Sequence, residues 1–389
     1  MFFLFFSCTG EKKFLIEDFS KINSKVDKYI DDGSLALLHV YLEDINGSPI
    51  YSYSKVNDSL LDNNIDENTW FRIWSMSKIV TISIAMDLVE EGIISLDDNV
   101  SDYLPEYSNL NCKGDDGIYP CEKKLKITHL LSHRSGFTYY AKNGSNWIAS
   151  LTTDLYPAVA DPVRFNNLDD FSKAAAKIPL DFEPGEMYTY GINQAILGRL
   201  IEVISGQSFY SFLKENIFDK LAMNDTKFHL TDEDRERFQP LRVNIKPNTD
   251  FNPSDFYLDG YTTAMDGYPY SEDSQAHFGG EGLVSTMSDF SKFCEMLVND
   301  GTYNGEKIVS SDGIKIMTGK KEIILTSQLR TGFILTLQYL KQKYPLHIIT
   351  NGFDKTQHIK LEHSNLKPYF NQIITSEKTG VKKPRSRKP

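Results

Sequence analysis

The sequence predicts a mixed α/β (α+β) fold, and three observations near the N-terminus and beyond support this class. Residues 14–31 place apolar side chains at helical spacing and stop at Asp31-Asp32-Gly33. Two strand patterns follow, Leu35–Glu43 and Pro49–Tyr53, and the Asn46-Gly47 pair between them is a strong hairpin turn signal. Further helical segments follow this hairpin along the chain.

The composition is that of an ordinary soluble globular protein. The chain has 389 residues, of which 40% are hydrophobic and 24% charged, enough for two or more domains. The net charge of −11 argues against general nucleic-acid binding, although the last eight residues carry five Lys or Arg and no acid. No apolar run approaches the roughly 20 residues that a membrane-spanning helix needs.

The N-terminus suggests export. Met1–Gly10 is an apolar run that resembles the tail of a bacterial lipoprotein signal, with Cys8 as the lipidated residue. The run is shorter than the apolar core of an export signal and lacks its basic start, which a start site placed too far downstream would explain. The alternative is a frayed terminus. We expect a bacterial cell envelope or periplasmic location, with membrane attachment through Cys8.

Two of the remaining cysteines have two interpretations. Cys112 and Cys121 flank a polar loop and could be bridged, which would suit an oxidising compartment, or they could be free. Cys294 lies in an apolar helical pattern and is expected to be buried.

After the predicted hairpin comes an amphipathic helix pattern that carries Ser75 and Lys78 and runs to about Glu91. Residues three apart share one face of a helix, so the two side chains can meet. A serine hydroxyl is a poor nucleophile until a neighbouring base takes its proton, and a lysine can be that base. This spacing also arises by chance, and the alternative is an N-capping Ser75 with a solvated Lys78.

The later elements alternate between helices and turns. Gly92–Asp98 and Leu104-Pro105 form a loop with a short helix, Ile127–Phe137 is a short capped helix that ends in a turn, and Pro184–Gly191 is a turn followed by a short extended piece. We expect helices from about Asn193 to Val203, over Ser208–Leu221 and over Ser288–Val298, a strand over Gly279–Thr286, and a polar insertion or lid over 230–275.

His129 and His133 are the candidates for a metal site. Their i, i+4 spacing would allow two ligands on one helical face. No third ligand is evident nearby, so the pattern favours a packing or capping role. We expect no metal and no cofactor.

Several motifs occur in a fixed order: Phe71–Lys78, Ile127–Gly136, Pro184-Gly185 with Tyr190, Leu197–Glu202, and Gly280–Thr286 with Asp289. Over about residues 15–319, this set resembles the serine β-lactamase and penicillin-binding-protein superfamily. It is closest to the class C-related branch that includes the β-lactamase-like carboxylesterases. The resemblance implies a β-lactamase/transpeptidase-like fold, in which an antiparallel sheet is flanked by helices with a helical subdomain.

The resemblance also implies roles for three residues. Ser75 would be the acylated nucleophile, Lys78 its base partner, and Tyr190 the group that carries the proton to and from the leaving group. The alternative for Tyr190 is a core aromatic residue, and Tyr188 lies too far from Leu197 for the spacing of the family. The implied reaction is acyl transfer from a small-molecule substrate to Ser75, followed by hydrolysis.

One departure from the family bears on the substrate. Ile192 stands where penicillin-binding proteins and class C β-lactamases typically have Asn, and Asn193 comes one position late. An Asn can hydrogen-bond a substrate amide, whereas Ile cannot. Ester or relaxed acyl substrates are therefore favoured, and a penicillin-recognising β-lactamase or D-Ala peptidase is the alternative.

The C-terminal part follows another pattern. In this family, the last strands of the sheet carry a Lys-Thr-Gly or related box, and that strand normally supplies an oxyanion-hole amide. The pattern expected for these strands is missing after about Gly319. Residues 334–384 instead resemble a haloacid-dehalogenase-type phosphatase, in which Thr350 would end a parallel strand and bind phosphate. Lys383 would be the cation beside it. The nucleophilic Asp-x-Asp and the closing acidic motif are missing, so this piece would not be a working phosphatase. Lys378–Gly380 spells the lactamase box but lies inside the phosphatase-type pattern.

We therefore expect a signal remnant over 1–13, a serine hydrolase domain over 14–319, a junction over 320–333, and a partial haloacid-dehalogenase-like fragment with a basic tail over 334–389. A gene fusion, a frameshift or an assembly error would produce this order. The nucleotide sequence around codons 319–334 and beyond codon 384 would show whether the break is real. Because the strand with the Lys-Thr-Gly-type box is missing, the alternative to an enzyme is a catalytically impaired product that acts at most as a binding protein.

Overall fold

The computed structural model describes residues 19–33, 35–44, 47–57, 65–138, 165–239, 242–244, 256–258, 270, 272–318, 347–350, 367 and 372–375. The chain divides into two compact units, residues 1–318 and 319–389. The first half of unit 1 contains α1 (Ser20–Asp31), β1 (Leu37–Glu43), β2 (Pro49–Val56), β3 (Phe71–Arg72), the 3₁₀ turn η1 (Trp74–Met76), α2 (Ser77–Glu90), η2 (Val100–Asp102), η3 (Pro105–Tyr107), β4 (Asn111–Gly114), β5 (Gly117–Pro120) and α3 (Ile127–Leu131). The unit continues with α5 (Leu168–Ala175), α6 (Asn193–Ser205), α7 (Phe209–Leu213), η5 (Lys214–Phe218), α8 (Asp232–Arg237), β6 (Arg242–Asn244), β7 (Phe256–Leu258), β8 (Val284–Ser285), α9 (Met287–Val298), β9 (Thr302–Tyr303), β10 (Glu306–Lys307) and α10 (Ser311–Met317).

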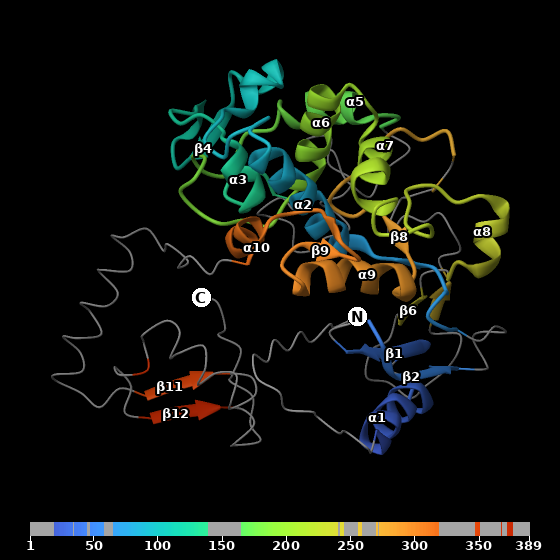
Figure 1. Ribbon diagram of the computed structural model, residues 1–389. Coiled ribbons are helices and arrows are strands. Elements are labelled where there is room, and N and C mark those ends of the chain that lie inside the picture. Colours follow the sequence, from blue (N-terminus) through green and yellow to red (C-terminus); the bar gives the residue numbers. More distant parts are fainter. Residues whose placement is uncertain are drawn as a thin grey trace. The chain divides into compact units, whose positions relative to one another are not determined.

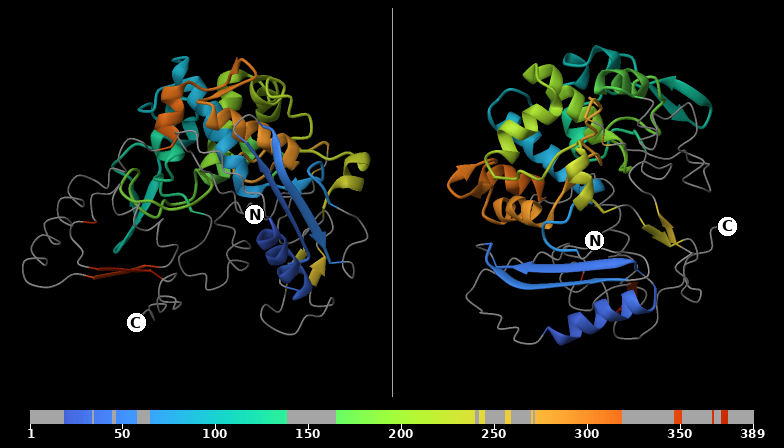
Figure 2. Two further views of the ribbon diagram at one scale, coloured as in Figure 1. Left: turned by 60° about the horizontal axis from the view of Figure 1, so that its bottom comes forward. Right: turned by 90° about the vertical axis from the view of Figure 1, so that its right-hand side faces the viewer.

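The N-terminal hairpin forms as predicted. β1 and β2 pair antiparallel, and Gly47 takes a positive φ of 74° in the turn between them, a conformation that glycine adopts without strain. α1 lies along one face of this hairpin (Figure 2), where the Phe19 and Tyr51 rings stack 4.2 Å apart. The helix begins at Ser20, and residues 14–18 of the predicted helix lie outside the described residues.

α2 is the central helix of unit 1, with α6 and α10 packed against it (Figure 1). Its buried residues surround most of the helix: Ser77, Lys78, Val80, Thr81, Ser83, Ile84, Ala85, Met86 and Leu88. The prediction of an amphipathic helix with one polar face is therefore wrong. The hydroxyls fit the interior because they donate to backbone carbonyls, as Thr81 does to Gly279 at 2.7 Å and Ser83 to Ile79 at 2.8 Å.

Two other predicted elements differ in detail. The helix predicted over Ser208–Leu221 is divided into α7 and the π-helical turn η5, a local change that sequence periodicity does not register. α6 extends past the predicted end near Val203 to Ser205, and Gly206 caps it with a positive φ of 68°. Of the predicted insertion, α8, β6, β7 and a few further residues are described, and the rest of 230–275 lies outside the described residues.

The short pair β3–β8 positions the residues before Ser75. Phe71 lies opposite Ser285 and Arg72 opposite Val284 in antiparallel register. The Ile73 amide continues the contact by donating to the Leu283 carbonyl at 3.1 Å. The strand predicted over Gly279–Thr286 is thus regular at Val284–Ser285, and the residues before it form a tight turn beside α2.

Cys112 and Cys121 form a disulfide, so the bridged interpretation is the one that the structure shows. The disulfide closes the open end of the β4–β5 hairpin, away from its turn. Cys294 is a free thiol that is half-buried, less than the sequence led us to expect. The loss of solvent around it raises its pKa to about 12. Among the described helices, none has the length and apolar character needed to cross a bilayer.

Unit 2 contains a parallel strand pair, β11 (His347–Thr350) and β12 (Gln372–Thr375). Thr350 is the last residue of β11, as the phosphatase-like pattern predicts. Lys383 and Lys378–Gly380 lie outside the described residues, as does Cys8 in unit 1.

Removing the disulfide is expected to lower the free energy of unfolding by about 2–3 kcal/mol, because the bridge closes a short loop and restricts the unfolded chain. Urea unfolding of a Cys112→Ala/Cys121→Ala double variant measures the difference. Cys294→Ala is the control that removes a thiol without opening a loop, and it should cost less. An unfolding midpoint of the double variant equal to that of the unaltered protein contradicts the prediction.

Candidate active site

Ser75 lies in η1, immediately before α2. The preceding residue, Trp74, has a positive φ of 40°, which is uncommon for a bulky side chain and turns the chain sharply between β3 and the helix. Ser75 is exposed, whereas Lys78 in the first turn of α2 is buried and only 6% exposed. The hydroxyl therefore faces solvent while the amine lies behind it.

The three predicted site residues meet at the Ser75 hydroxyl. Tyr190 Oη donates to Ser75 Oγ at 2.6 Å, and Lys78 Nζ donates to the same oxygen at 3.3 Å. Lys78 Nζ also lies 4.8 Å from the centre of the Tyr190 ring. The geometry excludes two of the simpler interpretations, because Lys78 is not solvated and Tyr190 is 39% exposed instead of packed in the core.

Among the described residues, Lys78 also contacts Gly280 and Glu281, which sequence reasoning missed. Its Nζ donates to the Gly280 carbonyl at 2.6 Å and lies 3.4 Å from Glu281 Oε2. Glu281 is buried and only 7% exposed. The sequence feature that could have pointed to Glu281 is an acidic residue inside the Gly280–Thr286 motif, at a position where the motif accepts any residue.

His133 supports Tyr190 from the side. The two rings stack with centroids 4.8 Å apart, while the Tyr188 ring meets His133 edge-on. The His133 Nδ1 accepts from the Gly191 amide at 3.3 Å and lies 2.8 Å from the Asn193 side-chain nitrogen. Burial, together with the nearby Lys78 charge, lowers the pKa of His133 to about 4, so the ring is neutral at pH 7.

Asn193 is directed into this cluster. Its Oδ1 accepts a hydrogen bond from Ser135 at 2.5 Å, and its side chain is fully buried. Asn193 thus holds His133 and does not replace the amide that Ile192 lacks. Gly191 allows the chain before Asn193 to pass close to Phe137, because a Cβ at Gly191 would lie 2.1 Å from the Phe137 carbonyl oxygen.

His129 and His133 have separate neighbours. His129 Nδ1 accepts from the Lys126 amide at 3.2 Å, a capping contact, and its ring packs against Gly185. In the part of the chain that the structure describes, three ligand-type side chains come close enough to share an ion at Cys112, Cys121 and Glu183. The two thiols of that group are already joined in the disulfide.

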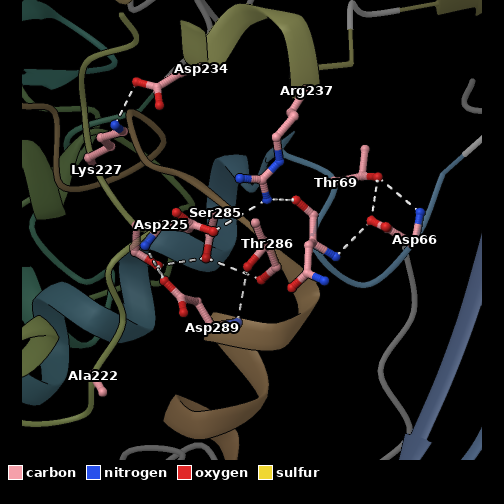
Figure 3. Close-up of polar contacts among 12 residues, drawn as sticks. Asp66, Thr69, Ala222, Asp225, Lys227, Asp234, Arg237, Ser285, Thr286 and Asp289 are labelled. Carbon is pink, nitrogen blue, oxygen red and sulfur yellow. Dashed lines mark hydrogen bonds and ion pairs between the residues drawn. The ribbon is translucent and has the colours of Figure 1, made fainter. Parts of the chain in front are cut away.

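The Gly279–Thr286 segment is anchored at both ends. Near Lys78, Ser77 Oγ accepts from the Leu283 amide at 3.2 Å. At the far end, Thr286 caps α9 by accepting from the Asp289 amide at 3.1 Å, and Asp289 Oδ2 accepts from the Asp225 amide at 2.6 Å (Figure 3). These contacts fix the backbone that presents the Gly280 carbonyl to Lys78.

Comparison with known proteins identifies two family patterns. The family model described as Beta-lactamase matches residues 31–339. A second model, described as Haloacid dehalogenase-like hydrolase, matches residues 302–388 and overlaps the end of the first.

Individual relatives are distant. Protein Rv1367c of Mycobacterium tuberculosis is 28% identical over 260 residues, which cover 65% of this chain and 60% of that protein. The Lovastatin esterase of Penicillium rubens is 28% identical over 287 residues, or 70% of this chain and 67% of the relative. The chain therefore spans about 60% of the length of the first of these relatives.

Solved structures share the fold. EstCE1, described as a hydrolase with promiscuous acyltransferase activity, superposes with a TM-score of 0.56 at 21% identity. The match covers 76% of this chain and 74% of EstCE1. The β-lactamase/transpeptidase-like fold predicted from the motifs, with helices and short antiparallel sheets, is confirmed.

The free energy of unfolding is expected to depend on His133 as the pH falls from 7 to 4.5. Its pKa is about 4 in the folded protein against 6.5 for an unperturbed histidine. Below pH 6.5 the unfolded chain binds the proton more readily, so stability is present above pH 6.5 and is lost progressively toward pH 4.

Urea unfolding across this pH range measures the effect. A His133→Gln variant is expected to show a shallower loss of stability on acidification than the unaltered protein, because carboxylates contribute equally to both. Parallel pH curves for the two proteins would rule out the histidine contribution.

Proposed function

Because the chain belongs to the β-lactamase family, we propose that it is a serine hydrolase that forms an acyl-enzyme at Ser75 and favours ester substrates. The observation that carries this proposal is the meeting of three side chains at one oxygen. Tyr190 and Lys78 both donate to Ser75 Oγ, at 2.6 and 3.3 Å.

The proposed reaction has two half-steps. Ser75 Oγ attacks the acyl carbonyl and gives its proton to the Lys78–Tyr190 pair, which delivers it to the leaving alcohol as the carbonyl–oxygen bond breaks. Water then attacks the acyl-Ser75 ester, losing a proton to the same pair, which returns it to Ser75 Oγ. The backbone amide of Ser75 is the candidate donor to the carbonyl oxygen as negative charge develops.

The surroundings of Ser75 support ester over amide substrates. Ile192 is buried and offers no hydrogen bond, and the Asn193 amide is engaged with Ser135 and His133. Trp74, which precedes Ser75, is an exposed aromatic side chain, 41% accessible. These features favour a substrate with an apolar acyl or alcohol part.

A p-nitrophenyl acyl ester tests the proposal. Ser75→Ala is expected to lower kcat/KM by at least about a thousand-fold because the nucleophile is lost. Tyr190→Phe should lower it by roughly 100-fold because proton transfer is impaired. Tyr188→Phe is the matched control and should retain the activity of the unaltered protein.

Other outcomes separate the alternatives. Unchanged turnover by Ser75→Ala would sink the assignment. Covalent labelling of Ser75 by a fluorescent penicillin, without ester turnover, would favour a penicillin-recognising β-lactamase or D-Ala peptidase. Folded protein that forms no adduct with either a penicillin or a fluorophosphonate would favour a binding protein without catalysis.

We also propose an exported protein attached to the membrane through lipidated Cys8. The Cys112–Cys121 disulfide supports an oxidising compartment. In fractionated bacterial cells, the protein is expected with the membranes, and a Cys8→Ser variant is expected to leave them. Recovery of both proteins in the soluble fraction contradicts the anchor.

The C-terminal region is proposed to be a partial haloacid-dehalogenase-like fragment over 334–389. The parallel pairing of β11 with β12 and the family match over residues 302–388 support this interpretation.

A further inference from the structure

Glu281 places a second ionisable group directly behind the proposed nucleophile. Its Oε2 lies 3.4 Å from Lys78 Nζ, and the two side chains are only 9% and 7% exposed. Charges withdrawn from water interact more strongly than charges on the surface. Removing one partner of such a pair leaves the other charge buried and uncompensated. The pair is therefore well placed to influence the chemistry of Lys78.

Three other contacts of Lys78 within the described part of the chain bring no second formal negative charge to its Nζ. The Ser75 hydroxyl and the Gly280 carbonyl contact Nζ at 3.3 and 2.6 Å but carry no formal charge. The Tyr190 ring presents its face at 4.8 Å. His133 is held neutral, since burial and the Lys78 charge lower its pKa to about 4. Among the described ion pairs, Glu281 is the anionic partner of Lys78.

The backbone holds Glu281 in a tight turn. The amides of Glu281 and Gly282 both donate to the Phe278 carbonyl, at 3.2 and 2.9 Å. A Cβ at Gly282 would lie 2.9 Å from the Phe228 ring, so this position has no room for a larger residue. The turn is followed by β8, which is paired with β3. The carboxylate is thus supported by the same pairing that positions the residues before Ser75.

We propose that Glu281 is a positioning residue that holds the ammonium form of Lys78 between Ser75 and Gly280 and thereby sets the pH at which the site becomes active. This inference rests on the serine hydrolase function proposed above. In the resting site, the ammonium group must first release a proton to solvent, against the attraction of the carboxylate. The neutral amine can then take the Ser75 proton as the bond from Oγ to the acyl carbon forms.

The pH dependence of kcat/KM for a p-nitrophenyl ester tests this role. Glu281→Gln keeps the shape of the side chain and its acceptor oxygen but removes the charge. The rising limb of the pH profile is expected to move to lower pH by about one unit or more, the usual effect of an opposite charge at this distance. Glu281→Asp, which restores a carboxylate, is expected to move the limb back toward that of the unaltered protein.

Asp181→Asn is the matched control. Asp181 is buried and pairs with Lys113 at 2.8 Å, so this variant removes another lysine-paired carboxylate outside the Ser75 cluster. It is expected to leave the limb in place, even if it lowers stability. Circular dichroism confirms that each variant is folded. If Glu281→Gln does not fold, Glu281→Ala provides the same loss of charge.

The two proposals fail in different ways. If Ser75→Ala retains full turnover, the serine hydrolase function itself is wrong. If Ser75→Ala is inactive but the charge-removing variants keep the unaltered limb, the role of Glu281 is overturned and the hydrolase stands. The rate of fluorophosphonate labelling against pH gives a second measure of the limb, because it requires only an activated serine. A shift in both measures supports the role.

Discussion

The burial of the Lys78 ammonium group is the constraint on which the site depends. A buried cation must be paired and hydrogen-bonded, and Lys78 obtains these contacts from two segments of the chain. Ser75 lies in the turn before its helix, the Gly280 carbonyl comes from a segment about 200 residues later, and Glu281 supplies the opposite charge. Satisfying Lys78 therefore requires the same approach of segments that creates the candidate site.

The position of α2 and the pairing of β3 with β8 bring these chain segments together. α2 lies centrally in unit 1 (Figure 1). The first residues of this helix are buried, whereas Ser75 in the preceding turn is exposed. The β3–β8 pair then joins the two chain segments that flank Lys78. His133 stacks on the Tyr190 ring, and Asn193 holds His133 through a hydrogen bond.

The sequence predicted much of this arrangement because the motifs occur in a recognisable order. Ser75, Lys78 and Tyr190 were assigned from that order, and the structure brings them together. Glu281 could not be assigned in the same way, because its proposed role depends on its contact with Lys78, which lies 203 positions away in the sequence. The burial around α2 was also missed. Its serine and threonine side chains appear polar in the sequence, yet backbone carbonyls accept their hydrogen bonds.

The central claim is that the Ser75 hydroxyl is the group that becomes acylated. Treating the folded full-length chain with a fluorophosphonate, followed by protease digestion and mass spectrometry, locates the modified residue. The account predicts a single adduct on the peptide that contains Ser75, and much slower labelling when Lys78 is replaced by Ala. An adduct on another serine, with Ser75 unmodified, would contradict it.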